Sequence, residues 1–461
     1  MSLQLGSTPV GTAKEATPIV AIHTAGFAAF VATASAMTQS WIAATGFAAK
    51  PHTHALIPSA TGGIDAVLVG IRDADDLFAL SHLPLALPER TYTFAPNAEV
   101  LNAYAAAFSW QLGSYQFSRY KKPKRDPVSL VIPDSAEAGS AQRAYAATKL
   151  IRDLVNTPTE DLGPAQLSDS AKQLADEFGA TFKEWVGKDL LAHNFPAIHA
   201  VGRASDRPPR LIELTWGDPA HPRVAVVGKG VCFDTGGVNI KGADSMRWMK
   251  KDMGGGAHAL GLARLVMAEK LPVYLHMLIP AVENSISGNA YRPGDVIATR
   301  KGLSVEIGNT DAEGRVILSD ALAFAAESNP EIIIDFATLT GAARVALGPE
   351  LPATFCNNET WMTALANASE KTRDPLWRMP LWQPYNAMIE PAIADLVNTG
   401  GPQAGAVTAA LFLEHFIPGG QAWIHIDLFA WNPKSRPGRP EGGEAQTLRA
   451  TLEMLRKRFK S

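Results

Sequence analysis

The stretch GRVILSDALAFAAESNPEIIIDFATL, residues 314–339, decides the fold class. Its first half has apolar residues at helical spacing, and its second half contains a short apolar run typical of a buried strand. Residues 255–280 repeat this order, because GGAHALGLARLVMAEK is followed by VYLHMLIP. Helices that alternate with buried strands predict an α/β domain whose central sheet is mixed, mostly parallel and flanked by helices.

Strand and helix candidates elsewhere divide the chain into lobes. Further strands are expected from RLIELTW at residues 210–216, RVAVVG at 223–228 and WIHIDLF at 423–429. The Ala-rich first third predicts a smaller α/β lobe, with a strand at residues 66–71, and residues 135–155 have the spacing of a helix that links two lobes. We therefore expect an N-terminal lobe at 1–134, a linker helix and connection at 135–164, and a larger domain at 165–461.

The composition indicates a globular protein without a strong charge bias. Of 461 residues, 42 are Lys or Arg and 45 are Asp or Glu, so the basic excess of a dedicated nucleic-acid binder is missing. The most obvious basic cluster is YKKPKRDP at residues 120–127, which is typical of a solvated loop. Nucleic acid as a partner is therefore unsupported, although it is not excluded.

The cysteines and the apolar runs bear on the compartment. Cys232 and Cys356 are too few for a disulfide framework and favour a reducing environment. No run has the length of a membrane span. Residues 18–37 imitate a signal peptide, but only one Lys beside a Glu precedes them and a His interrupts them, so we interpret them as a buried strand and helix. We expect a cytoplasmic protein.

Three Gly-rich segments carry an unusual density of charge, and no H-E-x-x-H, phosphate-loop or nucleophile-elbow motif accompanies them. They are VVGKGVCFDTGGVNIK at residues 226–241, MKKDMGGG at 249–256 and IGNTDAEGR at 307–315. The first is expected to present Lys229, Asp234 and Lys241 from loop positions after a strand that ends at Gly228. The third places Asp311, Glu313 and Arg315 at alternate positions, which share one face if the backbone is extended, before a helix that begins at Val316.

Carboxylates that meet in an apolar crevice repel one another unless cations neutralise them. The four candidates are Asp234, Asp252, Asp311 and Glu313. Two divalent cations held by such oxygens can clamp both oxygens of a hydrolytic step. A nearby lysine can lose its proton and ligate a metal, and a second lysine can stay charged and stabilise an oxyanion. Each residue alone could instead be a helix cap or a surface ion pair, such as Arg315 with Asp311.

At these residues the chain resembles the leucyl aminopeptidase, or cytosol aminopeptidase, family of dinuclear-metal enzymes. NTDAEGR at residues 309–315 matches the family signature, and similarity extends over about residues 112–440. The resemblance implies metal ligands at Lys229, Asp234, Asp252, Asp311 and Glu313. It implies that Lys241 polarises the scissile carbonyl and that Arg315 holds a bicarbonate-like anion as the general base. Substrate-pocket positions carried over from the family are Met249, Thr338, Leu339 and Ala406, which suit a medium aliphatic side chain.

The family implies a catalytic dimetal peptidase domain at residues 165–461. The expected activity is release of N-terminal amino acids, with a leucine-like preference, from peptides with a free N-terminus, using two Zn²⁺ and/or Mn²⁺ ions per subunit. It also implies a homo-oligomer, expected to be a hexamer. Two alternatives are a nucleic-acid-binding accessory protein and a catalytically silent homologue on the same fold. One departure is the last strand, WIHIDLFAWNP, which carries bulky aromatic residues where small ones are common in relatives.

Overall fold

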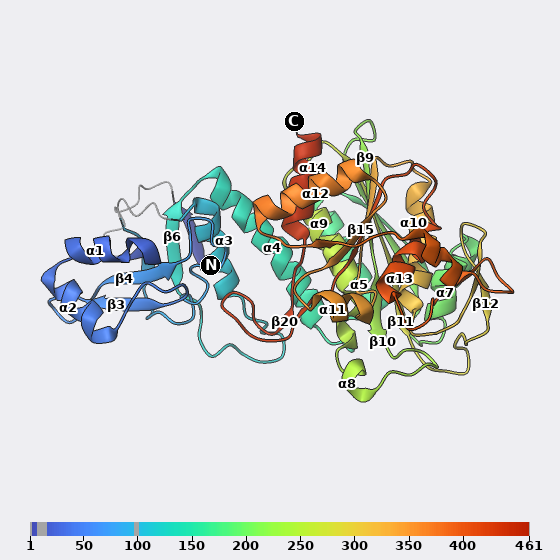
Figure 1. Cartoon of the computed structure of the whole chain (residues 1–461), viewed down its shortest axis with the longest axis horizontal. Helices are drawn as coiled ribbons and strands as arrows, with labels where there is room; N and C mark the ends of the chain where they lie inside the picture. Colours follow the sequence, from blue (N-terminus) through green and yellow to red (C-terminus); the bar gives the residue numbers. More distant parts are fainter. Residues whose placement is uncertain (1, 7–15, 96–100, 461) are drawn as a thin grey trace. The chain divides into compact units, whose positions relative to one another are not determined.

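The computed structural model describes residues 2–6, 16–95 and 101–460, which form two α/β units (Figure 1). One unit comprises Met1–Lys149 with Lys434–Glu441, and the other comprises Leu150–Pro433 with Gly442–Ser461. The expected pair of a smaller and a larger α/β domain is confirmed. No helix in the described part of the chain has both the length and the apolar character needed to cross a membrane.

The smaller unit is built on a six-stranded sheet. In spatial order its strands are β1 (Leu3–Gly6), β6 (Ser129–Pro133), β5 (Thr91–Phe94), β2 (Thr17–His23), β4 (Ile64–Ile71) and β3 (His54–Pro58). Only β3 runs antiparallel to its neighbour among these described strands. Helices η1 (Thr24–Gly26), α1 (Phe27–Thr33), α2 (Ala36–Thr45) and α3 (Ala103–Ser114) complete the unit.

The apolar stretch at residues 18–37 is a strand followed by helices. Strand β2 is largely buried, as expected, but α1 has no buried residue, so the expectation of a buried helix is wrong. The Ala-rich helix offers only Phe27, Phe30 and Val31 to the core, and these three side chains are partly covered. Farther along, α4 (Ala136–Asn156) confirms the predicted linking helix and carries the chain from one unit into the other.

The larger unit contains a nine-stranded sheet. In spatial order its strands are β16 (Trp377–Arg378), β15 (Ala353–Cys356), β18 (Trp423–Asp427), β14 (Ile332–Ala337), β9 (Arg223–Gly228), β11 (Tyr274–Asn284), β8 (Arg210–Trp216) and β7 (Thr181–Val186), with β10 (Gly230–Asp234) also pairing with β11. Strands β18, β14, β9 and β11 are parallel, and β10 is parallel to β11. Every residue of β14 is buried, because a central parallel strand is covered on both faces.

Helices cover both faces of this sheet. Helices α5 (Pro164–Phe178), α9 (Gly254–Ala268), α12 (Glu359–Thr372) and α14 (Leu448–Phe459) lie on one side, and α7 (Pro196–Gly202), α10 (Glu313–Ala326) and α13 (Gly405–Glu414) on the other (Figure 1). Glycines let α9 approach β9 closely: a Cβ on Gly228 would lie 2.5 Å from the Gly255 carbonyl oxygen. This contact brings the start of α9 against the end of β9.

Short elements complete the larger unit. They are α6 (Asp189–Ala192), α8 (Ala243–Met246), η2 (Met249–Met253), α11 (Gly341–Leu347) and η3 (Gln383–Ile389), a small sheet of β12 (Val296–Ala298), β13 (Ser304–Glu306) and β17 (Leu396–Val397), and the pair β19 (Trp431–Asn432) and β20 (Gly442–Gly443). Of these, α8, η2, α11 and the segment that leads into α11 contribute residues to the site described next.

Candidate metal centre and active site

The charged residues gather at the carboxyl ends of the parallel strands. Lys229 follows β9, Asp234 is the last residue of β10, Thr338 follows β14, and Asp427 is the last residue of β18. In an α/β sheet this edge is where ligand sites form, because neighbouring strands end together and their following loops diverge.

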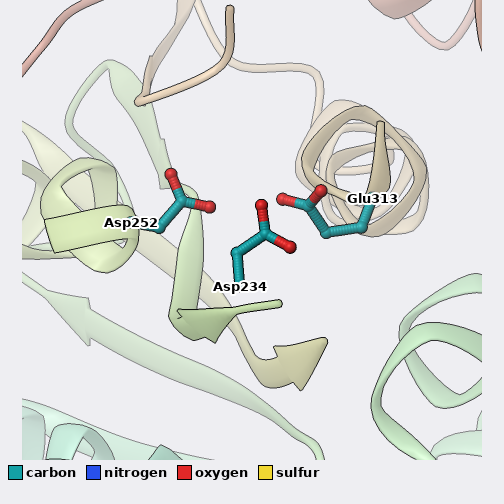
Figure 2. A group of neighbouring side chains, drawn as sticks. All are labelled: Asp234, Asp252 and Glu313. Atoms are coloured by element: carbon teal, nitrogen blue, oxygen red, sulfur yellow. The ribbon is translucent and has the colours of Figure 1, made fainter. Parts of the chain in front are cut away.

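Three carboxylates form the centre of the site (Figure 2). Asp234 comes from the end of β10, Asp252 from η2 and Glu313 from the first position of α10. All three are buried, and one oxygen from each lies within 4.8 Å of one from the others. Figure 2 shows the carboxylate of Asp234 between the other two. Buried anions this close need positive charge between them.

Two lysines supply positive charge within the chain itself. Lys229 Nζ lies 2.7 Å from Asp252 Oδ2 and 2.8 Å from Glu313 Oε1, and it donates to the Thr338 carbonyl oxygen at 3.0 Å. Burial disfavours this ammonium, but its carboxylate neighbours outweigh burial and raise the pKa of Lys229. The Lys229 ammonium thus lies between two buried carboxylates, which need a nearby cation.

The second lysine, Lys241, bridges Asp234 and Asp311. Its Nζ lies 2.9 Å from Asp234 Oδ2 and also contacts Asp311 Oδ1. Asp234 and the other carboxylates raise the pKa of Lys241 against the opposing effect of burial. Burial and the charge of Asp234 raise the pKa of Asp311 to about 6, although Lys241 opposes them.

The donor set fits divalent metal ions. Asp252 Oδ2 and Glu313 Oε1 face the Lys229 nitrogen but accept no hydrogen bond of good geometry from the described residues. Burial and the charge of Asp234 raise the pKa of Glu313 well above its ordinary value, as expected for a carboxylate that is crowded by other buried carboxylates. Hard carboxylate oxygens with one amine are ligands that Zn²⁺ and Mn²⁺ accept.

Neighbouring groups hold two of the carboxylates in place. Asp234 Oδ1 accepts hydrogen bonds from the Gly236 backbone N–H and the Asn284 side chain, each at 2.8 Å. Thr338 Oγ1 donates to Asp252 Oδ1, also at 2.8 Å. Donors that lock an acidic side chain keep its remaining oxygen aimed at the centre of the cluster.

Two expectations about local backbone are wrong. Helix α10 begins at Glu313 rather than Val316, so Glu313 and Arg315 are helical and do not share the face of an extended segment. Two positions along a helix turn by about 200°, so the two side chains diverge. Asp234 belongs to strand β10 rather than to a loop, because Gly230–Asp234 pairs with β11.

Arg315 is a buried cation in the first turn of α10. Burial lowers the pKa of Arg315 to about 10, while Asp427 and Glu313 favour its charge. Its Nε is buried without a hydrogen-bond partner among the described residues. The side chain therefore keeps its charge at neutral pH and has a donor to spare.

A cavity of about 710 Å³ opens beside the cluster. Of the residues predicted from the sequence, those that line it are Lys229, Asp234, Lys241, Met249, Asp252, Asp311, Thr338 and Leu339. The buried side chains of Glu313 and Arg315 are outside this lining, and so is Ala406, which packs in the hydrophobic core on α13.

Sequence reasoning missed two polar residues of the site, Asn284 and Asp427. Each is the last residue of a strand, β11 or β18, and each accepts or donates at the carboxyl edge of the sheet. Asp427 Oδ1 accepts from the backbone N–H groups of Leu339 and Thr340, which fixes the wall of the cavity. The sequence signal for both residues is a polar residue that ends an apolar strand.

The fold and the site together define an α/β protein that assembles carboxylates and lysines for metal-dependent chemistry at one edge of its larger sheet. Two family models match the chain. The catalytic domain of the cytosol aminopeptidase family matches residues 149–452, and the M17 aminopeptidase N-terminal domain matches residues 17–133. The second match extends to residues 17–111, which lie outside the stretch of similarity expected from the motifs.

Individual relatives agree with these matches. A probable cytosol aminopeptidase from Syntrophotalea carbinolica is 41% identical over 362 residues, which are 75% of this chain and 73% of the relative. The crystal structure of the cytosol aminopeptidase from Coxiella burnetii is 46% identical, covers 99% of both chains and gives a TM-score of 0.95. The bottromycin maturation enzyme BotP in complex with Mn is 32% identical, covers 96% of this chain and 99% of its own, and gives a TM-score of 0.85.

The chain therefore belongs to the cytosol aminopeptidase family. It is a metal-dependent aminopeptidase, a hydrolase that acts on peptides, and the resemblance drawn from the NTDAEGR motif is confirmed.

Proposed function

We propose that the cluster binds two divalent metal ions, Zn²⁺ and/or Mn²⁺, for hydrolysis of the bond after an N-terminal amino acid. The proposed ligands are Lys229, Asp234, Asp252, Asp311 and Glu313. The observation that carries the proposal is the set of three buried carboxylates within 4.8 Å of one another, with a lysine nitrogen between two of them. When bound, such a pair of cations lowers the pKa of water and polarises a carbonyl group.

Lys241 and Arg315 are the proposed catalytic residues. Lys241 lines the cavity and keeps its ammonium, so it can donate a hydrogen bond to the scissile carbonyl oxygen and stabilise the charge that develops there. Arg315 has a buried Nε to offer to a bicarbonate-like anion, which would serve as the general base. Both residues therefore act through charges that the fold fixes before the substrate arrives.

The same arrangement supports exopeptidase action on peptides with a free N-terminus. An unblocked N-terminal amine can lose its proton and offer a nitrogen donor to the proposed metal site, whereas a blocked terminus has no basic nitrogen to offer. Met249, Thr338 and Leu339 give the adjoining wall of the cavity an apolar surface for a leucine-like side chain. Ala406 would contribute to this subsite only through the packing of α13 behind that wall.

We also propose a setting for the enzyme. Its relatives are named cytosol aminopeptidases, which supports a cytoplasmic location. The proposed homohexamer rests on the family resemblance of the sequence motifs. The proposed division of labour places a non-catalytic lobe at residues 1–134, the connection at 135–164 and the catalytic domain at 165–461.

Metal dependence and residue roles can be tested together. The purified protein would be assayed on leucine anilides and dipeptides after chelation and after addition of Zn²⁺, Mn²⁺ or Co²⁺. Glu313→Ala is expected to lose bound metal and activity together. Arg315→Ala is expected to retain metal but to lose about 100-fold or more in kcat, as for other general-base systems. Glu370→Ala, an exposed acidic residue on α12, is the control.

Each outcome bears on a different part of the proposal. No metal-dependent release of an N-terminal residue contradicts the activity. Full metal content in Glu313→Ala contradicts its assignment as a ligand. Normal turnover by Arg315→Ala in bicarbonate-free buffer contradicts the assigned base.

A further inference from the structure

The active-site cavity contains a third lysine that the proposed mechanism does not use. Lys251 lies in η2 next to Asp252, lines the cavity and is 5% exposed. No carboxylate lies within ion-pair distance of its Nζ in the described parts of the chain, and no hydrogen bond to it is formed there. The Asp252 carboxylate is already engaged by Lys229 and Thr338.

An arginine stands beside this lysine. Lys251 Nζ lies 4.8 Å from the centre of the Phe429 ring, and Arg344 Cζ lies 4.9 Å from the same ring. Arg344 and Phe429 also line the cavity, and Arg344 is exposed and has no ion-pair partner among the described residues. Two cations therefore share one aromatic side chain at the wall of the cavity.

Packing on an aromatic ring does not neutralise these charges. A cation–π contact contributes about 0.5–2 kcal/mol, whereas a buried ammonium without a counter-ion costs several kcal/mol. Lysines that serve only packing keep the charged group in water and bury the stem. A lysine that is 5% exposed, unpaired and facing a cavity instead indicates a place for an anion.

The position of the pair identifies which anion. Met249, Thr338 and Leu339 line the same cavity, and in the proposed function they contact the side chain of the N-terminal residue. Met249 and Lys251 come from the same short helix, and Leu339 and Arg344 come from the same segment after β14. A side chain that follows this wall therefore ends near the two cations.

We propose that Lys251 and Arg344 bind the carboxylate of an acidic N-terminal residue, so that the enzyme releases N-terminal glutamate in addition to aliphatic residues. This inference rests on the proposed aminopeptidase site and extends it to a substrate class. Lys251 and Arg344 are specificity residues in this scheme, because they contact the substrate's side chain and not the reacting bond. Charge-assisted hydrogen bonds to the carboxylate of the substrate would favour an N-terminal glutamate over an N-terminal glutamine.

The test compares substrates that differ only in charge. The quantity measured is the ratio of kcat/KM for Glu p-nitroanilide to that for Gln p-nitroanilide, with Leu p-nitroanilide as the reference for activity. A ratio above about 10 is expected for the wild-type enzyme. Lys251→Met and Arg344→Gln should each lower it by about tenfold. Lys172→Met removes one exposed charge from α5, outside the cavity lining, and should leave the ratio unchanged.

Several results would overturn the proposal. Equal rates on the Glu and Gln substrates by an enzyme that cleaves the Leu substrate contradict the acidic subsite alone, whereas no cleavage of any substrate contradicts the proposed function itself. If both variants keep the preference for the Glu substrate over the Gln substrate, residues other than Lys251 and Arg344 cause that preference. If the variants lose activity on Leu-Gly relative to Leu-Gly amide but keep the Glu to Gln ratio, the cations bind the substrate's C-terminal carboxylate instead. Thermal melting checks that Lys251→Met folds. Arg344→Gln changes an exposed residue, so it tests the proposal even if Lys251→Met is unstable.

Discussion

Replacing Gly314 by alanine tests whether Lys229 is held where the site requires it. Gly314 is the second residue of α10, between Glu313 and Arg315. A Cβ at this position would lie 2.6 Å from Lys229 Cε, 2.7 Å from its Cδ and 2.7 Å from its Nζ. Carbon atoms in good contact are about 3.5–4.0 Å apart, so the lysine would have to move by about 1 Å.

Lys229 has little freedom to make that movement. Its side chain is 3% exposed, and its Nζ is fixed by Asp252, Glu313 and the Thr338 carbonyl. Alanine is the better helix former by about 1 kcal/mol, whereas overpacking costs about 1–3 kcal/mol, so the net change in the free energy of unfolding is a loss of about 0–2 kcal/mol. A displacement of about 1 Å at a catalytic site costs about 100-fold in turnover. Activity is therefore expected to suffer much more than stability.

The assay is kcat/KM on Leu p-nitroanilide together with thermal melting of Gly314→Ala. Gly139→Ala is the matched control, because Gly139 also lies in a helix, α4, and an added Cβ would come no closer than 3.4 Å to the end of the Arg143 side chain. The control should melt at or above the wild-type temperature with normal activity. A Gly314→Ala enzyme with wild-type turnover would refute the close packing of Lys229 on the first turn of α10.

Two further predictions concern buried polar groups. Asp335 accepts hydrogen bonds from His425 Nδ1 at 2.6 Å and from Trp423 Nε1 at 2.7 Å inside the sheet. Asp335→Ala removes this shared acceptor, so the free energy of unfolding should fall by about 3–5 kcal/mol. A denaturant titration that matches the wild type would contradict this prediction. Burial and the neighbouring His54 and His52 lower the pKa of His82 from 6.5 to about 3. The unfolded chain therefore takes up this proton at a higher pH than the folded chain, and the free energy of unfolding should fall by about 2 kcal/mol from pH 7 to pH 5. His82→Gln should make this pH dependence smaller. An unchanged pH dependence in the variant would show that other groups cause it.

Much of the fold could be predicted from the sequence because burial dictates it. Strands such as RVAVVG and EIIIDFATL need apolar residues at nearly every position when helices cover both faces of a sheet, and both form where they were expected. The meeting of the carboxylates follows from the same rule, since parallel strands end at one edge. The charged Gly-rich segments could therefore be assigned to one site before any distance was known.

The exact backbone at the site could not be predicted in the same way. Helix α10 begins at Glu313, although Gly314 is a poor helix former, because this start places the Glu313 carboxylate against Lys229. Strand β10 likewise continues to Asp234 through pairing with β11, a contact made about 50 residues away along the chain. Tertiary contacts therefore decide where α10 begins and where β10 ends, and the local periodicity of the sequence does not show these contacts.

The three lysines of the cavity show most clearly what sequence position leaves open. Lys229, Lys241 and Lys251 all lie in Gly-rich charged segments, and the family resemblance implies roles for the first two but none for Lys251. The structure separates them by their partners. The first two lysines each contact two carboxylates of the cluster. Lys251 has no carboxylate partner among the described residues, so its charge remains available to a substrate. In the proposed function, the chemistry of the cleavage and the choice of substrate fall to different lysines of one cavity, so a substitution at Lys251 is expected to alter the choice of substrate without removing the groups that perform the cleavage.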